Sequence, residues 1–131
     1  MGAAVSEAAR SQRERDFYRR LLDLGSTSDP TPFLEQALDL IGKTMISPGD
    51  KVIVEAPTFL ATIQCFRLYG ADIYGAPIDA DGVQVDQLEK MIDELKPKLV
   101  YLVPSFGNPS GAMLSLERRK RILEIAVRTK T

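Results

Sequence analysis

The loop around Asn108 contains the residue types best suited to binding a ligand. Asn108 stands between Gly107 and Pro109, shortly before Gly111, and the loop follows an apolar run that ends at Pro104. Proline removes backbone freedom, and glycine lets the backbone approach a ligand closely. A neutral amide held in this way can donate a hydrogen bond to a phenolate-like oxygen without adding charge. The alternative is an ordinary turn, because Asn-Pro and Ser-Gly pairs are common in loops.

Phe59 is the second candidate, at the end of the segment Ala-Pro-Thr-Phe that follows another apolar run. An aromatic ring at this place can stack on a flat ligand, or it can be a core residue at the start of a helix. Cys65 is the only cysteine and there is no histidine. This composition excludes Ser-His-Asp and Cys-His catalysis and Cys-based metal sites. The candidates are therefore binding groups, with no catalytic residue and no metal ligand among them.

A parallel sheet is the element that must position these two loops. Continuous apolar runs predict strands, and the segments between these runs predict helices. One of the predicted helices, at 58–69, offers Ile63, Phe66 and Leu68 for burial. The alternation predicts an α/β three-layer sandwich with three parallel strands and helices on both faces. Ligands of such sheets bind beyond the carboxyl ends of the strands, where both candidate loops fall. The predicted strands are 51–57, 71–78 and 98–104, and the predicted helices are 6–24, 33–42, 58–69, 86–95 and 115–127.

From about residue 37 to the end, the sequence resembles the large domain of fold-type I pyridoxal-phosphate (PLP) aminotransferases, in particular the aminoadipate aminotransferase branch. The resemblance rests on the stretches ALDLIGKTMISPGDKVIVEAPTF, FRLYGADI and KPKLVYLVPSFGNPSGAMLSLERRKRILEIA. It implies the local strand order 2-1-3, as in flavodoxin-like sheets, and PLP as cofactor. It also implies that Asn108 bonds the 3-oxygen of the PLP ring and that Phe59 stacks on the ring. The complete family transfers an amino group between an amino acid and a 2-oxo acid.

The same resemblance implies several groups that these residues do not supply. In the family, the Schiff-base lysine, the aspartate that pairs with the pyridine nitrogen and the substrate arginine lie in later segments. The Gly-Ser-Gln type of phosphate cup is replaced here by Phe33, Leu34 and Glu35, and the glutamate would repel a phosphate. We therefore expect a partial large domain that is catalytically incompetent as given, with an incomplete PLP site and no PLP bound.

Residues 1–32 are predicted to form an N-terminal helix and linker, and 33–131 the aminotransferase-like segment of the same single α/β domain. Residues 11–41 resemble the helix that leads into GAF-type signalling domains. The two resemblances meet near residues 35–41. One hypothesis is therefore that the chain is a chimera, formed by recombination or by engineering.

The composition narrows the set of partners. The chain has 131 residues, 44% of them hydrophobic, and a formal net charge of −1. This charge balance gives no reason to expect nucleic acid or a membrane as a partner. The sequence also has no secretory signal, so we expect a cytoplasmic protein. Two other functions stay open: a structural or interaction domain that forms a homo-oligomer through open sheet edges or the N-terminal helix, and a flavodoxin-like module for a small ligand.

Overall fold

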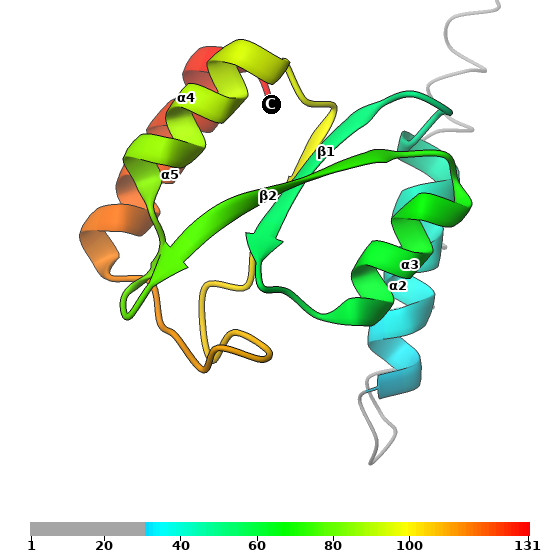
Figure 1. Ribbon diagram of the computed structural model, residues 1–131, viewed down its shortest axis with the longest axis horizontal. Coiled ribbons are helices and arrows are strands. Elements are labelled where there is room, and N and C mark those ends of the chain that lie inside the picture. Colours follow the sequence, from blue (N-terminus) through cyan, green and yellow to red (C-terminus); the bar gives the residue numbers. More distant parts are fainter. Residues whose placement is uncertain (1–30) are drawn as a thin grey trace, which may run out of the picture.

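A computed structural model describes residues 31–131 as an α/β fold of alternating helices and strands (Figure 1). The predicted helix at 6–24 and the predicted linker up to residue 30 lie outside the described residues. Residues 31 and 32, predicted as linker, instead begin the first described helix. None of the described helices combines the length and the apolar character needed to cross a membrane. In chain order the elements are α2 (Thr31–Met45), β1 (Lys51–Ala56), α3 (Leu60–Leu68), β2 (Asp72–Asp79), β3 (Gly82–Val83), α4 (Val85–Leu95), β4 (Leu99–Tyr101) and α5 (Leu116–Thr129).

The sheet has the order β3-β2-β1-β4, and β1 pairs in parallel with both β2 and β4. The predicted α/β class and the local order 2-1-3 are therefore confirmed. The prediction of three parallel strands was incomplete, because the sheet is mixed and has a fourth strand, β3, antiparallel to β2. Gly82, at φ +91°, lets the chain fold back beside Asp79, whose carboxylate accepts the Asp81 N–H at 2.8 Å. A short connection ending in glycine is typical of a hairpin.

The last predicted strand is shorter than expected, because β4 ends at Tyr101 and not at residue 104. Proline cannot donate a ladder hydrogen bond, so Pro104 itself could not pair as predicted. Within the described residues β4 pairs with β1 alone. The predicted association of copies of the chain through an open sheet edge stays a prediction.

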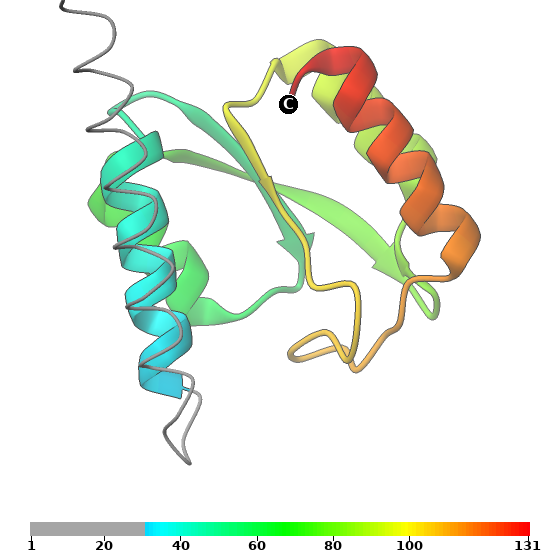
Figure 2. The ribbon, with the colours of Figure 1, turned by 180° about the vertical axis from the view of Figure 1, so that it is seen from behind.

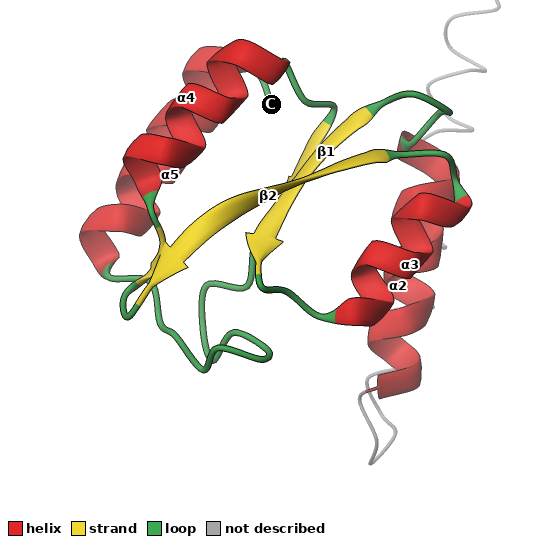
Figure 3. Ribbon diagram, in the orientation of Figure 1, coloured by secondary structure: helices red, strands yellow, loops and turns green. Residues whose placement is uncertain are grey.

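Two apolar cores lie on the two faces of the sheet. Helices α2 and α3 cover one face, and α4 and α5 cover the other (Figures 1, 2 and 3). Side chains alternate along a strand, so Val52 and Val54 of β1 pack toward α2 and α3 while Ile53 packs toward α4 and α5. This arrangement is the predicted three-layer sandwich. The other buried members are Leu38, Ile46, Phe66 and Ala71 in the first core, and Ala76, Val83, Val85, Leu88, Ile92, Leu114 and Ile125 in the second.

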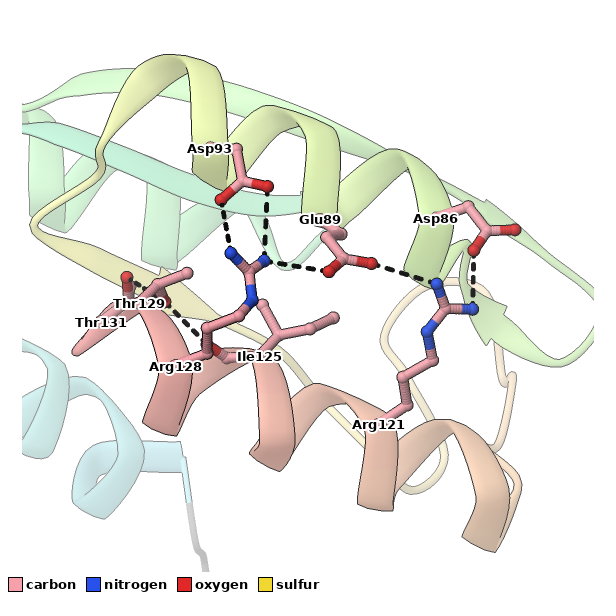
Figure 4. Close-up of polar contacts among 8 residues, drawn as sticks. All are labelled: Asp86, Glu89, Asp93, Arg121, Ile125, Arg128, Thr129 and Thr131. Atoms are coloured by element: carbon pink, nitrogen blue, oxygen red, sulfur yellow. Dashed lines mark hydrogen bonds and ion pairs between the residues drawn. The ribbon is translucent and has the colours of Figure 1, made fainter.

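An ion-pair ladder joins α4 to α5 on their outer sides (Figure 4). Arg121 bridges Asp86 at 2.6 Å and Glu89 at 3.1 Å, and Arg128 bridges Glu89 at 2.9 Å and Asp93 at 3.1 Å. Both arginine side chains are about half exposed, so water and salt screen the attraction strongly. The ladder therefore adds little to the stability of the fold, and the apolar core beneath the two helices supplies most of it.

Tyr69 joins the end of α3 to α2. Its hydroxyl donates a hydrogen bond to the Asp39 carboxylate, and its ring lies so close to Gly42 that a Cβ atom there would clash with Tyr69 Cδ2. The bond to Asp39, followed by desolvation, raises the pKa of Tyr69 from 10.0 to about 12.

We expect Tyr69 to titrate well above the ordinary tyrosine pKa of 10.0. Because its folded-state pKa exceeds the unfolded value of 10.0, its bond to Asp39 contributes stability below pH 10 and loses that contribution as the pH rises toward about 12. Tyrosinate absorbance should show one late step in the native protein. Asp39→Asn should move that step to lower pH, and a wild-type titration with no late step would contradict the assignment.

Candidate functional site

The two candidate loops open at the same end of the sheet. Residues 57–59 connect β1 to α3, and residues 102–115 connect β4 to α5. Because β1 and β4 are parallel neighbours, their carboxyl ends meet at one edge. Figures 1 and 2 show both loops at that edge from opposite sides.

The Asn108 loop is a closed turn with a narrow neck. At the neck, Leu114 N–H donates to Pro104 O at 3.0 Å, and further in, Gly107 N–H donates to Ala112 O at 3.0 Å. The peptide bond before Pro109 is cis. The Asn108 side chain is exposed, and no hydrogen bond within residues 31–131 uses its amide. The amide is therefore free to donate to a ligand.

Phe59 lies at the start of α3, as the residue that precedes its first turn, with φ −62° and ψ 122°. It is partly buried and belongs to neither apolar core. The sequence left open a core position or a ligand-stacking position for this ring. Its place at the sheet edge, outside both cores, favours the second.

Thr58 and Thr62 are polar groups at this edge that sequence reasoning missed. Both side chains are buried, and neither hydroxyl has a hydrogen-bond partner in the described part of the chain. Leaving a buried hydroxyl unpaired costs about 1–3 kcal/mol. The only sequence signal was a pair of threonines with helical i, i+4 spacing around the start of α3, which is common in ordinary helices.

Glu55 is a buried carboxyl group near the end of β1, with 5% of its surface exposed. It alternates with Val54, so it lies on the α4 and α5 face of the sheet. Burial raises the pKa of Glu55, and a hydrogen bond from the backbone of Val103 partly offsets the rise. Its place within the apolar run KVIVEA hid it from sequence reasoning, which treated that run only as a strand.

The residues at this edge fit one part of PLP and not another. The ring suits the aromatic face of Phe59 and the free amide of Asn108. The amino end of α2 lies at the same end of the molecule (Figure 1), but there Leu34 is 38% exposed and Glu35 carries an exposed carboxylate. A phosphate would meet an apolar side chain and a negative charge at this helix terminus.

The loops themselves lack cations and amines. Residues 57–59, 79–82 and 102–115 contain no lysine and no arginine. Covalent attachment of a carbonyl cofactor needs a lysine amine, so it cannot come from these three loops. The side chains of Arg118 and Arg119 reach these loops from α5, but they are bonded to Asp79 and to Pro104 O, so an anion in a flavodoxin-like site would have to compete with those bonds. In residues 31–131 there is also no group of three or more Cys, Asp and Glu side chains placed to hold a metal ion.

A family model described as Aminotransferase class I and II matches residues 34–131 of the chain. Among curated proteins, an aromatic-amino-acid aminotransferase of Thermococcus litoralis is 47% identical over 97 residues, which is 70% of this chain and 23% of that protein. A 2-aminoadipate transaminase of Thermus thermophilus is 40% identical over 93 residues, which is 71% of this chain and 23% of that protein.

Solved structures show the same likeness. A kynurenine aminotransferase from Pyrococcus horikoshii, in complex with PMP, matches with TM-score 0.69 and 44% identity over 73% of this chain and 25% of that one. An alpha-aminoadipate aminotransferase from Thermus thermophilus, complexed with N-(5'-phosphopyridoxyl)-L-leucine, matches with TM-score 0.71 and 38% identity over the same shares, 73% and 25%. The chain thus spans about a quarter of the length of these relatives.

Proposed function

The chain belongs to the class I and II aminotransferases, and on that premise we propose that residues 31–131 form one wall of a PLP site. The observation that supports the proposal is that the loop with Phe59 and the loop with Asn108 open at the same edge of the sheet, because β1 and β4 are parallel neighbours. Phe59 lies outside both cores, and the Asn108 amide has no partner among the described residues. When bound, PLP supplies the electron sink that lets an amino group pass from an amino acid to a 2-oxo acid.

The two side chains have separate roles in this proposal. Phe59 stacks on the ring and holds its plane. Asn108 donates its amide N–H to the 3-oxygen of the ring. This hydrogen bond orients the ring without adding a charge. The unpaired hydroxyls of Thr58 and Thr62 lie beside Phe59 in sequence and leave polar atoms at the same edge.

We infer that this chain by itself holds the ring weakly and does not catalyse the transfer. A stack and one hydrogen bond contribute about 2–3 kcal/mol, whereas a millimolar dissociation constant already requires about 4 kcal/mol. The absence of lysine from the three edge loops and the carboxylate of Glu35 on α2 support this inference.

Titration with PLP, followed by NMR of the Asn108 side-chain amide, tests ring binding. We expect that amide and the Phe59 ring protons to shift, and that Asn108→Ala weakens binding about fivefold through the lost hydrogen bond. Phe59→Leu keeps an apolar side chain but loses the stacking face, so it should weaken binding as well. Met113→Ala is the matched control, because Met113 is exposed in the same loop. Unchanged affinity in both site variants would contradict the proposal.

Borohydride reduction of the mixture, followed by peptide mapping, tests the absence of catalysis. Labelling should be scattered over several lysines, at the level seen with an unfolded control. A single lysine labelled in a saturable way would show a specific imine-forming site and would overturn the inference of weak, non-covalent ring binding.

A further inference from the structure

The side chain of Arg119 holds both ends of the loop that contains Asn108. Its Nε donates to Leu114 O at 2.9 Å, and its Nη2 donates to Pro104 O at 2.8 Å and to Ser105 Oγ at 3.0 Å. Pro104 O also accepts the Leu114 N–H at 3.0 Å. The guanidinium therefore spans the neck at which the loop leaves β4 and returns to α5.

The position of Arg119 is unfavourable for the helix alone. It lies in the first turn of α5, where the partial positive charge of the helix terminus disfavours a cation. The neighbouring arginines have carboxylate partners, since Arg118 pairs with Asp79 and Arg121 with Asp86. In residues 31–131 the hydrogen bonds of the Arg119 side chain go to three neutral oxygens. The loop, and not the helix, explains an arginine at this position.

The loop needs such an external support. Phe106 has φ +52° and Gly111 has φ +71°, both in the left-handed region. Left-handed backbone at a residue other than glycine persists only where the surrounding structure holds it. Gly107 is buried within the loop, and its N–H is used by the bond to Ala112 O. A planar guanidinium with several fixed donors can bridge the two sides of the neck, which a lysine amine cannot do with the same geometry.

We propose that Arg119 is a positioning residue that closes the neck of the 104–114 loop and thereby fixes the Asn108 amide for the ring oxygen. Its effect on PLP rests on the function proposed above for Asn108. Its effect on the loop does not depend on that function.

Amide hydrogen exchange of the whole chain without ligand tests the effect on the loop. Arg119→Ala should speed exchange at Gly107 and Gly111, whose N–H groups are bonded within the loop, by about tenfold relative to Ile53 in the buried strand β1. Arg121→Ala is the matched control, since it removes a similar side chain from the same helix without touching the loop. Equal acceleration of loop and strand amides, or none in the loop, would overturn the proposal.

A double-mutant cycle with PLP as the probe tests the effect on Asn108. Arg119→Ala should weaken binding about as much as Asn108→Ala, roughly fivefold, and should add little when Asn108 is already alanine. Additive losses would mean that Arg119 acts by another route. Arg119→Lys keeps the charge and should recover only part of the lost binding. This lysine variant also serves as the second test if the alanine variant folds poorly. If Asn108→Ala binds PLP as well as the wild type, the proposed function fails, while the exchange experiment still decides whether Arg119 orders the loop.

Discussion

Replacing Phe66 by alanine should lower the free energy of unfolding by about 3–5 kcal/mol, the typical cost of removing a buried aromatic side chain. Phe66 is fully buried and belongs to the core between α3 and the sheet. Its ring meets Tyr101 of β4 edge to face, with centroids 6.0 Å apart and planes 80° apart. Domains of this size are stable by only about 5–15 kcal/mol, so the loss is a large share of the total.

Chemical denaturation of Phe66→Ala and Leu68→Ala measures this effect against a control in the same helix. Leu68 lies two residues further along α3 and is 82% exposed, so its replacement should change the free energy of unfolding by about 0.5 kcal/mol or less. Equal losses in the two variants would mean that α3 does not attach to the sheet through Phe66.

The contrast between these two residues shows how far periodicity can predict a fold. The alternation of apolar runs correctly predicted α/β layers, and Phe66 was correctly expected to be buried. Leu68 was expected to be buried as well, and that prediction was wrong. Helix α3 has nine residues, and Thr62 and Phe66, four residues apart, form its buried face. Leu68 follows Phe66 by two residues, in the last turn, and therefore lies on another side of the helix.

The candidate site, like the fold, was predicted from the sequence only in part. The loops that contain Asn108 and Phe59 were placed at one edge from the predicted parallel sheet, because parallel strands bring their carboxyl ends together, and the resemblance supplied the strand order. The β3 hairpin and the contacts of Arg119 were not predicted. Arg119 reaches Pro104, 15 positions earlier in the chain, and contacts at this separation leave no mark on local periodicity. Such contacts depend on how α5 returns to the sheet, which only the folded chain defines.

Replacing Gly70 by alanine should cost roughly 2–5 kcal/mol, the sum of a left-handed backbone and an overpacked contact. Gly70 has φ +80°, and a Cβ atom there would lie 2.8 Å from Pro48 Cα, a backbone atom that cannot rotate away. Its carbonyl accepts the Gly49 N–H at 2.8 Å, so the turn before β1 and the turn before β2 are held together. Gly49 is the matched control, because it has φ +87° and nothing within 4 Å of a Cβ position.

Gly49→Ala should therefore cost only about 1–2 kcal/mol, the strain of a left-handed alanine. Thermal or chemical unfolding of both variants measures the difference, and equal losses would mean that the contact with Pro48 is not tight in solution. Both glycines lie at the amino ends of β1 and β2, away from the Asn108 loop. The folded fraction of Gly70→Ala should consequently show the same shift of the Asn108 amide with PLP as the wild type. A weakened shift there would mean that ring binding follows overall stability, and it would argue against a site formed by the two loops themselves.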